Sequence, residues 1–313
     1  MHLPLRDWSL AAAGHAWTVL PELRQRVRPV SAPPTEQWHV DLVDPQMGSV
    51  RLLGRYHRVP GARTVLLIVH GLGGTPTSPY CLRAACEAAR RGWSSLRIGM
   101  RGCTGDGEDL YHAGLGSDLG AVLNDPSLAG YERVLVLGYS LGGHLSLVHA
   151  LEPAPRVQAV AAVSSPLNLE LSCQAIDLRR GFVYRHHVLN ALKACYAVTA
   201  NRRSLPTPAD QVHRVRTIRE WDRVAVVPRF GFDDVADYYQ QASVGPRLRD
   251  VQCPSLYLGM RHDPMIPPWV VEPSLATSSG GRFEYRWLDN GGHVFAPGSW
   301  ETDTIDWLDR QRR

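Results

Sequence analysis

The chain has 313 residues, of which 44% are hydrophobic and 20% charged, and its formal net charge is +4. This length allows one large domain or two small ones. A fold of this size buries roughly 75% of the surface that its unfolded chain exposes, so its core needs no metal or disulfide. Lys193 is the only lysine, and the arginines form no dense block. We therefore do not expect a nucleic-acid-binding protein.

The cysteines and the N-terminal segment indicate in which cellular compartment we expect the protein. The cysteines are scattered and include no C-x-x-C pair, which favours reduced thiols. The apolar stretch over residues 9–20 is interrupted by His15 and lacks the unbroken apolar core of a signal peptide. No run approaches the roughly 20 apolar residues of a spanning helix. We expect a cytoplasmic protein without an integral membrane segment, with peripheral membrane contact and oligomeric state left open. The cysteines are Cys81, Cys86, Cys103, Cys173, Cys195 and Cys253.

The first part of the chain predicts an arm followed by two strands. Residues 1–36 end in the Pro-rich stretch RPVSAPPTE and are interpreted as an N-terminal arm. Alternating apolar residues over 38–44 and 49–57 predict two strands, joined by a turn at residues 45–48.

From residue 64 onward, apolar strand patterns alternate with helical patterns. This alternation is typical of a parallel sheet that is covered by helices on both faces. The predicted strands span residues 64–69, 93–98, 133–138 and 157–165, and the predicted helices span residues 79–92, 116–125 and 141–151.

The alternation stops after Pro166 and resumes near residue 254. Residues 167–250 contain helical patterns, such as 184–203 and 233–242, and no convincing strand. Two further strands and a last helix then follow. The sequence thus predicts one α/β domain over 37–166 and 251–313, with a helical cap or lid inserted at 167–250. The later elements span residues 254–260, 282–288 and 299–311.

The sequence GYSLG at residues 138–142 matches the pattern G-x-S-x-G, with Ser140 at its centre. The match alone is weak, but a predicted strand precedes it and a predicted helix follows it, as a nucleophile elbow requires. Small residues allow the sharp turn, and the helix N-terminus supplies partial positive charge. We interpret Ser140 as a candidate nucleophile; the alternative is a glycine turn that happens to contain a serine.

A serine hydroxyl needs a histidine base and an acid that orients the base. In this type of sheet the chain order is serine, acid, histidine. Asp263 follows the strand at 254–260, and His293, the last histidine of the chain, follows the strand at 282–288. Asp289 is the rival acid, interpreted as a strand-end cap, and His262 is interpreted as a surface neighbour.

Oxyanion donors are expected from two strand-to-helix junctions. The loop HGLGG at residues 70–74 follows an apolar strand, and its glycines let the backbone approach a substrate closely. The expected donors are the backbone N–H groups of Leu72 and Leu141, and His70 is interpreted as a residue that braces the loop. Residues expected at the substrate pocket are His70, Gly71, Gly73 and Tyr139.

Other chemistries find less support in the residues. Related sheets that carry dehalogenases or epoxide hydrolases use an aspartate at the elbow, where this chain has Ser140. His186 and His187 are adjacent on a predicted helix and face different directions, so we expect no metal site. No cofactor is expected either.

Motifs over about residues 13–300 resemble the YheT-like (EMB8-like) family of α/β hydrolases. The resemblance implies a mostly parallel sheet with flanking helices, and serine-dependent hydrolysis of carboxylic esters or acyl lipids. It also implies Ser140, Asp263 and His293 as the triad, with Leu72 and Leu141 as oxyanion donors. The motifs are HAWTVLPELRQR, HGLGGTPTSPY, MRGCTGDGEDLYHAGLGSDL, GYSLGGH, EWDRVAVVPRFGFDDVADYYQQAS, HDPMIPP and NGGHVF.

Three positions depart from the family pattern, namely Gly73, Asn168 and Arg261. None belongs to the expected triad, so they affect the pocket rather than the chemistry. The cap is rich in arginine and aromatic residues, which fits either a solvated face over an aromatic core or an acyl tunnel with an anionic-headgroup rim.

We expect a serine esterase that acts on a small-molecule ester or acyl lipid through an acyl-enzyme. Three alternatives remain at this point: acyl transfer or thioester hydrolysis with the same triad, lysophospholipase activity, and a catalytically silent receptor or scaffold. Acyl-chain length is not fixed by the sequence.

Overall fold

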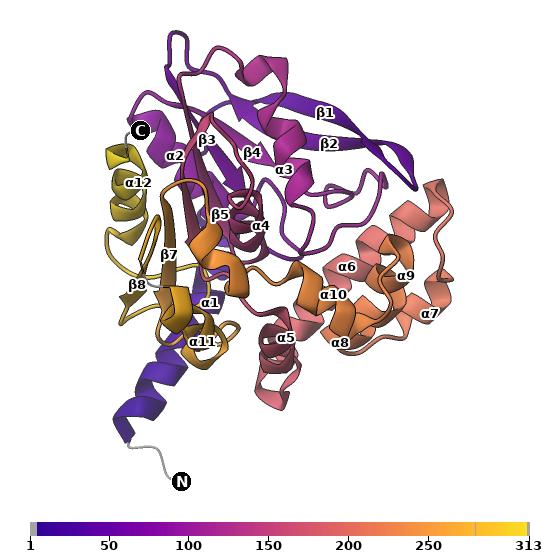
Figure 1. Ribbon diagram of the computed structural model, residues 1–313. Helices are drawn as coiled ribbons and strands as arrows, with labels where there is room; N and C mark the ends of the chain where they lie inside the picture. Colours follow the sequence, from indigo (N-terminus) through magenta and orange to yellow (C-terminus); the bar gives the residue numbers. More distant parts are fainter. Residues whose placement is uncertain (1–4, 279, 312–313) are drawn as a thin grey trace.

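The computed structural model describes residues 5–278 and 280–311 of the chain (Figure 1). In this part of the chain, eight strands form one sheet in the order β1-β2-β4-β3-β5-β6-β7-β8. β1 and β2 pair antiparallel with each other, and β2 pairs antiparallel with β4, whereas all later pairs are parallel. The strands are β1 (Glu36–Asp44), β2 (Gly48–His57), β3 (Thr64–Val69), β4 (Ser94–Ile98), β5 (Arg133–Tyr139), β6 (Val157–Val163), β7 (Ser255–Met260) and β8 (Phe283–Leu288).

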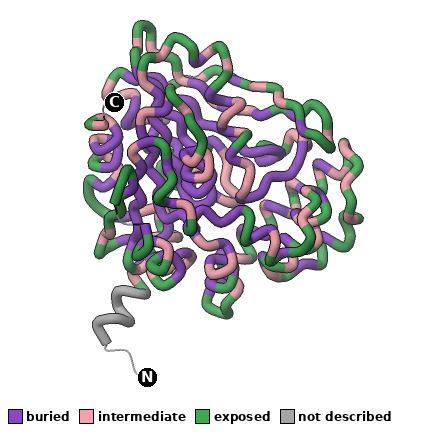
Figure 2. Tube along the Cα trace, viewed as in Figure 1, coloured by how far each residue is buried: buried purple, intermediate pink, exposed green. Residues whose placement is uncertain are grey.

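Helices cover both faces of this sheet, as the apolar strand patterns predict. Alternate residues of a strand point to opposite faces. In β3, Val65 and Leu67 belong to one buried cluster and Leu66 and Ile68 to the other. The first cluster is covered by α3 (Gly116–Leu123), α4 (Leu141–His149) and the cap, the second by α2 (Pro79–Arg90) and α12 (Trp300–Arg310) (Figures 1 and 2). The predicted α/β-hydrolase architecture is confirmed.

Between β6 and β7 the chain forms the expected helical cap, and no strand occurs among the described residues of this segment. Part of it is π-helical, at η3. The cap helices lie together beside the sheet (Figure 1). They are α5 (Leu169–Asp177), η2 (Arg179–Gly181), α6 (Phe182–Arg202), α7 (Ala209–His213), α8 (Ile218–Trp221), η3 (Asp222–Val226), α9 (Val227–Phe230) and α10 (Val235–Ala242), followed by η4 (Gly245–Asp250).

Two helices were not predicted. Residues of the expected N-terminal arm form α1 (Leu5–Val27), and residues between the predicted strands at 254–260 and 282–288 form α11 (Pro268–Ser278). Both helices contain an internal proline, Pro21 and Pro273 respectively. Proline removes a backbone donor and disfavours helix interiors, so the sequence signal for both helices is weak.

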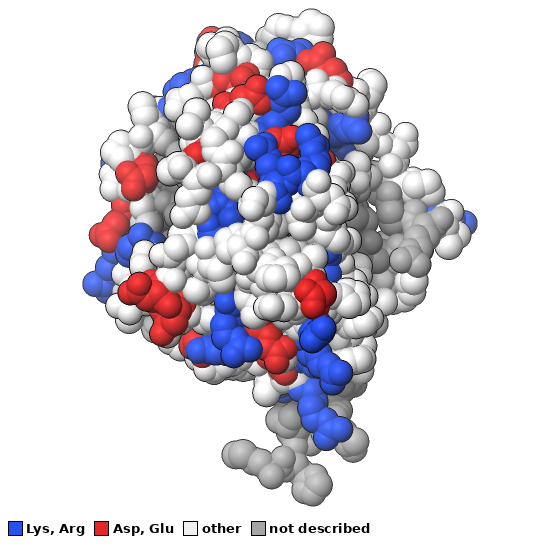
Figure 3. Space-filling model, turned by 90° about the vertical axis from the view of Figure 1, so that its right-hand side faces the viewer, with Lys and Arg blue, Asp and Glu red and all other residues white. Residues whose placement is uncertain are grey.

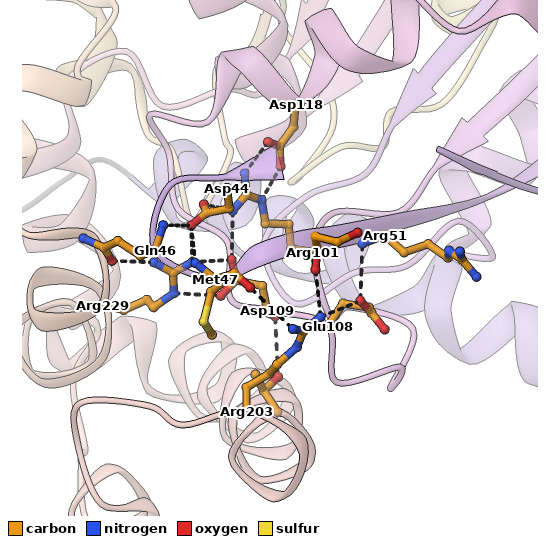
Figure 4. Close-up of polar contacts among 12 residues, drawn as sticks. Asp44, Gln46, Met47, Arg51, Arg101, Glu108, Asp109, Asp118, Arg203 and Arg229 are labelled. Atoms are coloured by element: carbon orange, nitrogen blue, oxygen red, sulfur yellow. Dashed lines mark hydrogen bonds and ion pairs between the residues drawn. The ribbon is translucent and has the colours of Figure 1, made fainter. Parts of the chain in front are cut away.

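A buried ion network joins the cap to the core (Figure 4). Arg229 of α9 binds Asp109 through two nitrogens, at 2.8 and 2.6 Å, and Asp44 at 3.1 Å. Arg101 contacts the same two carboxylates at 2.8 and 2.6 Å and holds Asp118 through two nitrogens at 2.7 Å each. Burial acts to raise the pKa of Asp44. Hydrogen bonds from Arg101 and from backbone N–H groups, together with the charge of Arg229, outweigh burial and hold this pKa below its usual range. Arg229 thus fastens the cap to β1 and to the loop after β4, and Arg101 of that loop holds the same two carboxylates.

Charges on the outer surface are arranged differently. On the face seen in Figure 3, acidic and basic side chains are intermingled in small groups. Cap arginines contribute exposed ion pairs, for example Arg219 with Glu170. Exposed pairs of this kind add little to stability.

Candidate active site

Ser140 occupies a strained position between β5 and α4. Its backbone has φ 51° and ψ −122°, a conformation that L-residues rarely adopt. Its N–H donates to Val163 O at 2.8 Å, which ties the turn to the neighbouring strand. The glycines of the motif allow this turn: a Cβ on Gly142 would lie 2.3 Å from His70 O, and one on Gly138 would lie 2.4 Å from Gly142 O. Only glycine fits at these two positions.

Positive φ values gather at this edge of the sheet. Besides Ser140, the described non-glycine residues with positive φ are Ser164, which follows β6, and Val294, which follows His293, with φ 49° and 52°. The N–H of Val294 donates to Ser164 Oγ at 3.5 Å. Strain of this kind clusters at functional sites, where the surrounding structure maintains it. The loops after β5, β6 and β8 therefore meet at one strained edge.

Asp263 and His293 form a buried pair. His293 Nδ1 lies 2.9 Å from Asp263 Oδ2, and the two residues are 8% and 3% exposed. Asp263 Oδ1 accepts the N–H groups of Met265 and Ile266 at 2.8 and 2.9 Å. Burial opposes ionisation, but the charge and hydrogen bond of His293 together with these N–H groups hold the pKa of Asp263 below its usual value. A carboxylate thus orients the His293 ring.

The structure places the predicted acid and base in direct contact, after β7 and β8, and Ser140 at the same edge of the sheet, after β5. Met265 and Ile266, beside Asp263, line the same cavity as Ser140. Within the described residues, no hydrogen bond joins Ser140 Oγ to the His293 ring. Catalytic hydrogen bonds are often long before substrate binds. The rival Asp289 is exposed and pairs with Arg261 instead, at 3.1 Å.

Helix α1 covers the base loop. Thr18 Oγ1 accepts the N–H of His293 at 2.8 Å. A Cβ on Gly292 would lie 2.2 Å from Gly14 O, and one on Gly14 would lie 2.0 Å from His262 O. Because both positions are glycine, the backbone of α1 can contact the backbone of the loops that carry His262 and His293. The segment expected as an arm therefore positions the loop that carries His293.

The loop after β3 lies directly against Ser140. A Cβ on Gly71 would lie 3.0 Å from Ser140 Cβ. Leu72 and Leu141 both line the cavity, and within the described chain neither of their N–H groups has a hydrogen-bond partner. These two expected oxyanion donors are thus available to a ligand.

Two tyrosines that the sequence did not single out hold this loop. Tyr80 Oη accepts the N–H of Gly71 at 3.0 Å, and Tyr111 Oη accepts the N–H of Gly73 at 2.9 Å. Gly73 has φ +71° and faces α6 of the cap. Tyr111 belongs to the Tyr-His pair of the family motif, which is the signal that could have indicated it.

Several residues expected at the pocket do not line it. His70 is fully buried; its Nδ1 contacts Gly71 O at 2.8 Å, its Nε2 accepts the N–H of Met100 at 3.1 Å, and burial lowers its pKa to about 4. The placement of Tyr139 in the pocket is wrong. It lies in the second buried cluster and donates to Glu301 Oε1 at 2.9 Å, because the side chain points to the α2 and α12 face. Gly71 stands behind Ser140, and neither it nor Gly73 is part of the lining.

The cavity beside Ser140 has a volume of about 90 Å³ and lies between core and cap. One water needs roughly 10–15 Å³ of such space, so the cavity suits a small group rather than a long acyl chain. Two other departures from the family pattern lie outside its lining: Asn168 caps α5 by accepting the N–H of Leu171 at 3.0 Å, and Arg261 is exposed. Apolar lining residues include Leu169, Ile176, Ile218, Trp221, Val226 and Ile266.

Metal and membrane features are absent from the part of the chain described here. Among its residues, no group of three or more His, Cys, Asp or Glu could hold a metal ion. None of its helices is long and apolar enough to cross a bilayer.

Comparisons with known proteins show the family and the fold. The family model described as alpha/beta hydrolase fold matches residues 64–295. The chain is 33% identical over 261 residues to YheT of Escherichia coli (strain K12), an esterase by name, covering 78% of this chain and 76% of YheT. The chain belongs to the α/β-hydrolase family, in its YheT-like group.

More distant relatives carry other names. This chain is 24% identical to human phospholipase ABHD3 over 79% of its own length but only 62% of that protein. The solved esterase Pf2001 of Pyrococcus furiosus superposes with a TM-score of 0.57 at 16% identity, covering 88% of this chain and 93% of that one. A proline iminopeptidase of Mycobacterium smegmatis gives 0.57 at 19% identity, covering 88% and 98%. These two structures show the fold alone, and their different names illustrate that fold does not set the leaving group.

Proposed function

We propose that the protein is a serine hydrolase of carboxylic esters that works through an acyl-enzyme. The observation that carries this proposal is the buried Asp263–His293 pair, with Oδ2 and Nδ1 2.9 Å apart, at the same edge of the sheet as the strained Ser140. The similarity to proteins named as esterases, a monoacylglycerol lipase and phospholipases favours an ester over an amide as the substrate.

The proposed reaction assigns one role to each group. His293 takes the proton of Ser140 as the serine oxygen attacks the ester carbonyl, and it then protonates the leaving alcohol. Asp263 fixes the ring tautomer, because its carboxylate contacts Nδ1 and leaves Nε2 for the serine. Water, activated by the same ring, releases the acid.

Charge that develops on the carbonyl oxygen is stabilised by the N–H groups of Leu72 and Leu141. Neither N–H group has a hydrogen-bond partner within the described chain, and that of Leu141 lies at the N-terminus of α4. Each donor in such a site contributes about 3 kcal/mol to transition-state stabilisation. Tyr111 and Tyr80 keep the first donor in place through Gly73 and Gly71.

The size of the cavity favours a short acyl group. A volume of about 90 Å³ with mainly apolar walls holds a few carbon atoms. Initial rates over p-nitrophenyl esters of two to sixteen carbons, with a monoacylglycerol and a lysophospholipid, test this. We expect the highest kcat/KM at the short end; a maximum at the long end or on the lysophospholipid would contradict the assignment.

Ser140→Ala tests the nucleophile on the best of these esters. We expect kcat to fall by about 10⁴-fold or more, because only the oxyanion donors and substrate binding would remain. Ser146→Ala is the matched control, since Ser146 lies in α4, which begins directly after Ser140, and its hydroxyl donates to Gly142 O at 2.7 Å. Unchanged turnover in Ser140→Ala would overturn the proposal. Mostly new ester in the presence of added alcohol would identify an acyltransferase instead.

A further inference from the structure

The cavity beside Ser140 contains two buried polar side chains with unused hydrogen-bonding capacity. His112 and Asp222 both line it, and they are 8% and 7% exposed. His112 comes from the core loop after β4, and Asp222 is the first residue of η3 in the cap. Two polar groups thus stand where core and cap meet, in a cavity that is otherwise mainly apolar.

The hydrogen bonds of His112 define its tautomer. Nδ1 accepts the N–H of Gly114 at 3.1 Å, so the proton of the neutral ring is on Nε2. Within the described chain, Nε2 has no hydrogen-bond partner. Burial, together with the charges of Arg101 and Arg229, lowers the pKa of His112 to about 3. The ring is therefore neutral at neutral pH and offers one N–H donor.

The His112 ring is also held in place. Its centroid lies 4.3 Å from that of Phe230, 5.3 Å from Phe232 and 5.5 Å from Tyr238. A Cβ on Gly114 would lie 2.8 Å from His112 Cε1, so only glycine lets the loop wrap the ring this closely. The donor has a fixed direction, which a specific contact requires.

Asp222 offers the complementary acceptor. Its Oδ2 accepts the hydroxyl of Tyr239 at 2.5 Å, and Oδ1 has no partner in the part of the chain that the structure describes. Packed rings link His112 to Asp222. The ring of Tyr238 packs on His112, and its centroid lies 5.2 Å from that of Tyr239, the residue that donates to Asp222. Asp222 begins a π-helical turn, a conformation that is frequent at functional sites.

His112 Nε2 and Asp222 Oδ1 are not among the completely buried side-chain atoms without a partner in the described chain, so both stay accessible to a group bound in the cavity. A hydroxyl can donate to one group and accept from another. We propose that His112 and Asp222 form a subsite for a neutral hydroxyl group on the substrate, away from the ester bond. This inference rests on the proposed ester hydrolysis and names its substrate class: short esters that carry a hydroxyl.

The pair fits a neutral hydroxyl better than a charged group. A substrate carboxylate would oppose ionisation of the buried Asp222 side chain beside it, and a cation would meet the N–H of His112. A plain alkyl chain would leave both polar groups buried without partners. A site that hydrogen-bonds a substrate hydroxyl rejects the analogue that lacks it.

The test compares esters that differ only by hydroxyl against methyl. Methyl 6-hydroxyhexanoate is paired with methyl heptanoate, and methyl 3-hydroxybutyrate with methyl 3-methylbutyrate, with hydrolysis followed by pH-stat. We expect kcat/KM to favour the hydroxy ester in at least one pair by about tenfold or more. His112→Phe, which keeps the ring size, and Asp222→Leu each remove this preference. Ile218→Val, a lining change without polar groups, keeps the ratio.

Binding to the Ser140→Ala protein separates this inference from the proposed function. Calorimetric Kd values for the same ester pairs should show the same preference, and His112→Phe in that background should abolish it. Equal Kd values within both pairs, or a preference that survives both His112→Phe and Asp222→Leu, would overturn the subsite. A binding preference without any turnover in the wild-type protein would leave the subsite standing and overturn ester hydrolysis.

Discussion

Two buried polar regions of this protein differ in how completely their groups are paired. In the ion network between cap and core, each of the two arginines binds two or three carboxylates, and Asp109 is wholly buried among them. In the cavity, His112 and Asp222 are also buried, yet each retains an unused donor or acceptor within the described chain. The completely paired groups fasten the fold, whereas the unused capacity beside Ser140 is what the proposed subsite rests on.

The Asp263–His293 pair is also hydrogen-bonded, and the proposed function gives it a catalytic role. Replacing Asp263 by Asn keeps the shape and removes the charge that orients His293. We expect kcat/KM on a short ester to fall by roughly 10⁴-fold, as when a triad aspartate is replaced in a serine protease. Asp289→Asn, on the exposed rival acid, should leave the rate unchanged. Equal losses in both variants would contradict the assignment of the acid.

Breaking the ion network should cost stability. Arg229→Met leaves Asp109 and Asp44 without one cationic partner, and removing one partner of a buried pair costs about 3–5 kcal/mol. Urea unfolding measures this loss. Arg219→Met, which breaks only the exposed pair with Glu170, should cost about 1 kcal/mol or less. Similar losses in both variants would show that the network does not fasten the cap.

The buried Asp222 side chain should make the stability of the folded protein depend on pH. Burial raises its pKa to about 7, so the folded protein holds a proton that the unfolded chain releases near pH 4. The contribution of Asp222 to the free energy of unfolding is complete below pH 4. As the pH rises to about 7 this contribution is lost, and the loss amounts to up to about 4 kcal/mol. The Tm of Asp222→Asn, measured relative to the wild-type Tm, should therefore increase between pH 5 and pH 8. A difference that does not vary with pH would contradict the raised pKa.

The smallest effect is expected for the tyrosine that holds the oxyanion loop. Tyr111→Phe removes the acceptor of the Gly73 N–H, and loss of one such hydrogen bond should lower kcat/KM by about two- to tenfold. Tyr131→Phe is a matched control, because it removes a bond of similar length, 2.7 Å, to Tyr56. A rate loss in the control as large as in Tyr111→Phe would show that the effect is not local to the loop.

Strand and helix patterns were enough to predict the sheet, the cap and the positions of Ser140, Asp263 and His293. These patterns can be recognised in short stretches of sequence, because apolar strands alternate with helices. In such folds the catalytic residues follow the carboxyl ends of the parallel strands. The same alternation could have corrected Tyr139: Leu135 and Leu137 lie on its face of β5, away from the cavity.

Contacts between distant segments could not be predicted in this way. The network links Asp44 to Arg229 across 185 positions, and no local pattern indicates such a pair. Helix α1 was missed because Gly14 and Pro21 weaken its helical pattern, although Gly14 is what allows the close contact with the acid loop. The unused capacity of His112 and Asp222 depends on tautomer and burial, which only the assembled cavity defines.

Labelling with a fluorophosphonate tests most directly whether Ser140 is an activated nucleophile. Intact mass and peptide mapping of the wild-type protein should show one adduct, on the peptide that contains Ser140. The Ser140→Ala protein should gain none, and His293→Ala should label far more slowly. An unlabelled wild-type protein, or an adduct on a different residue, would contradict the account.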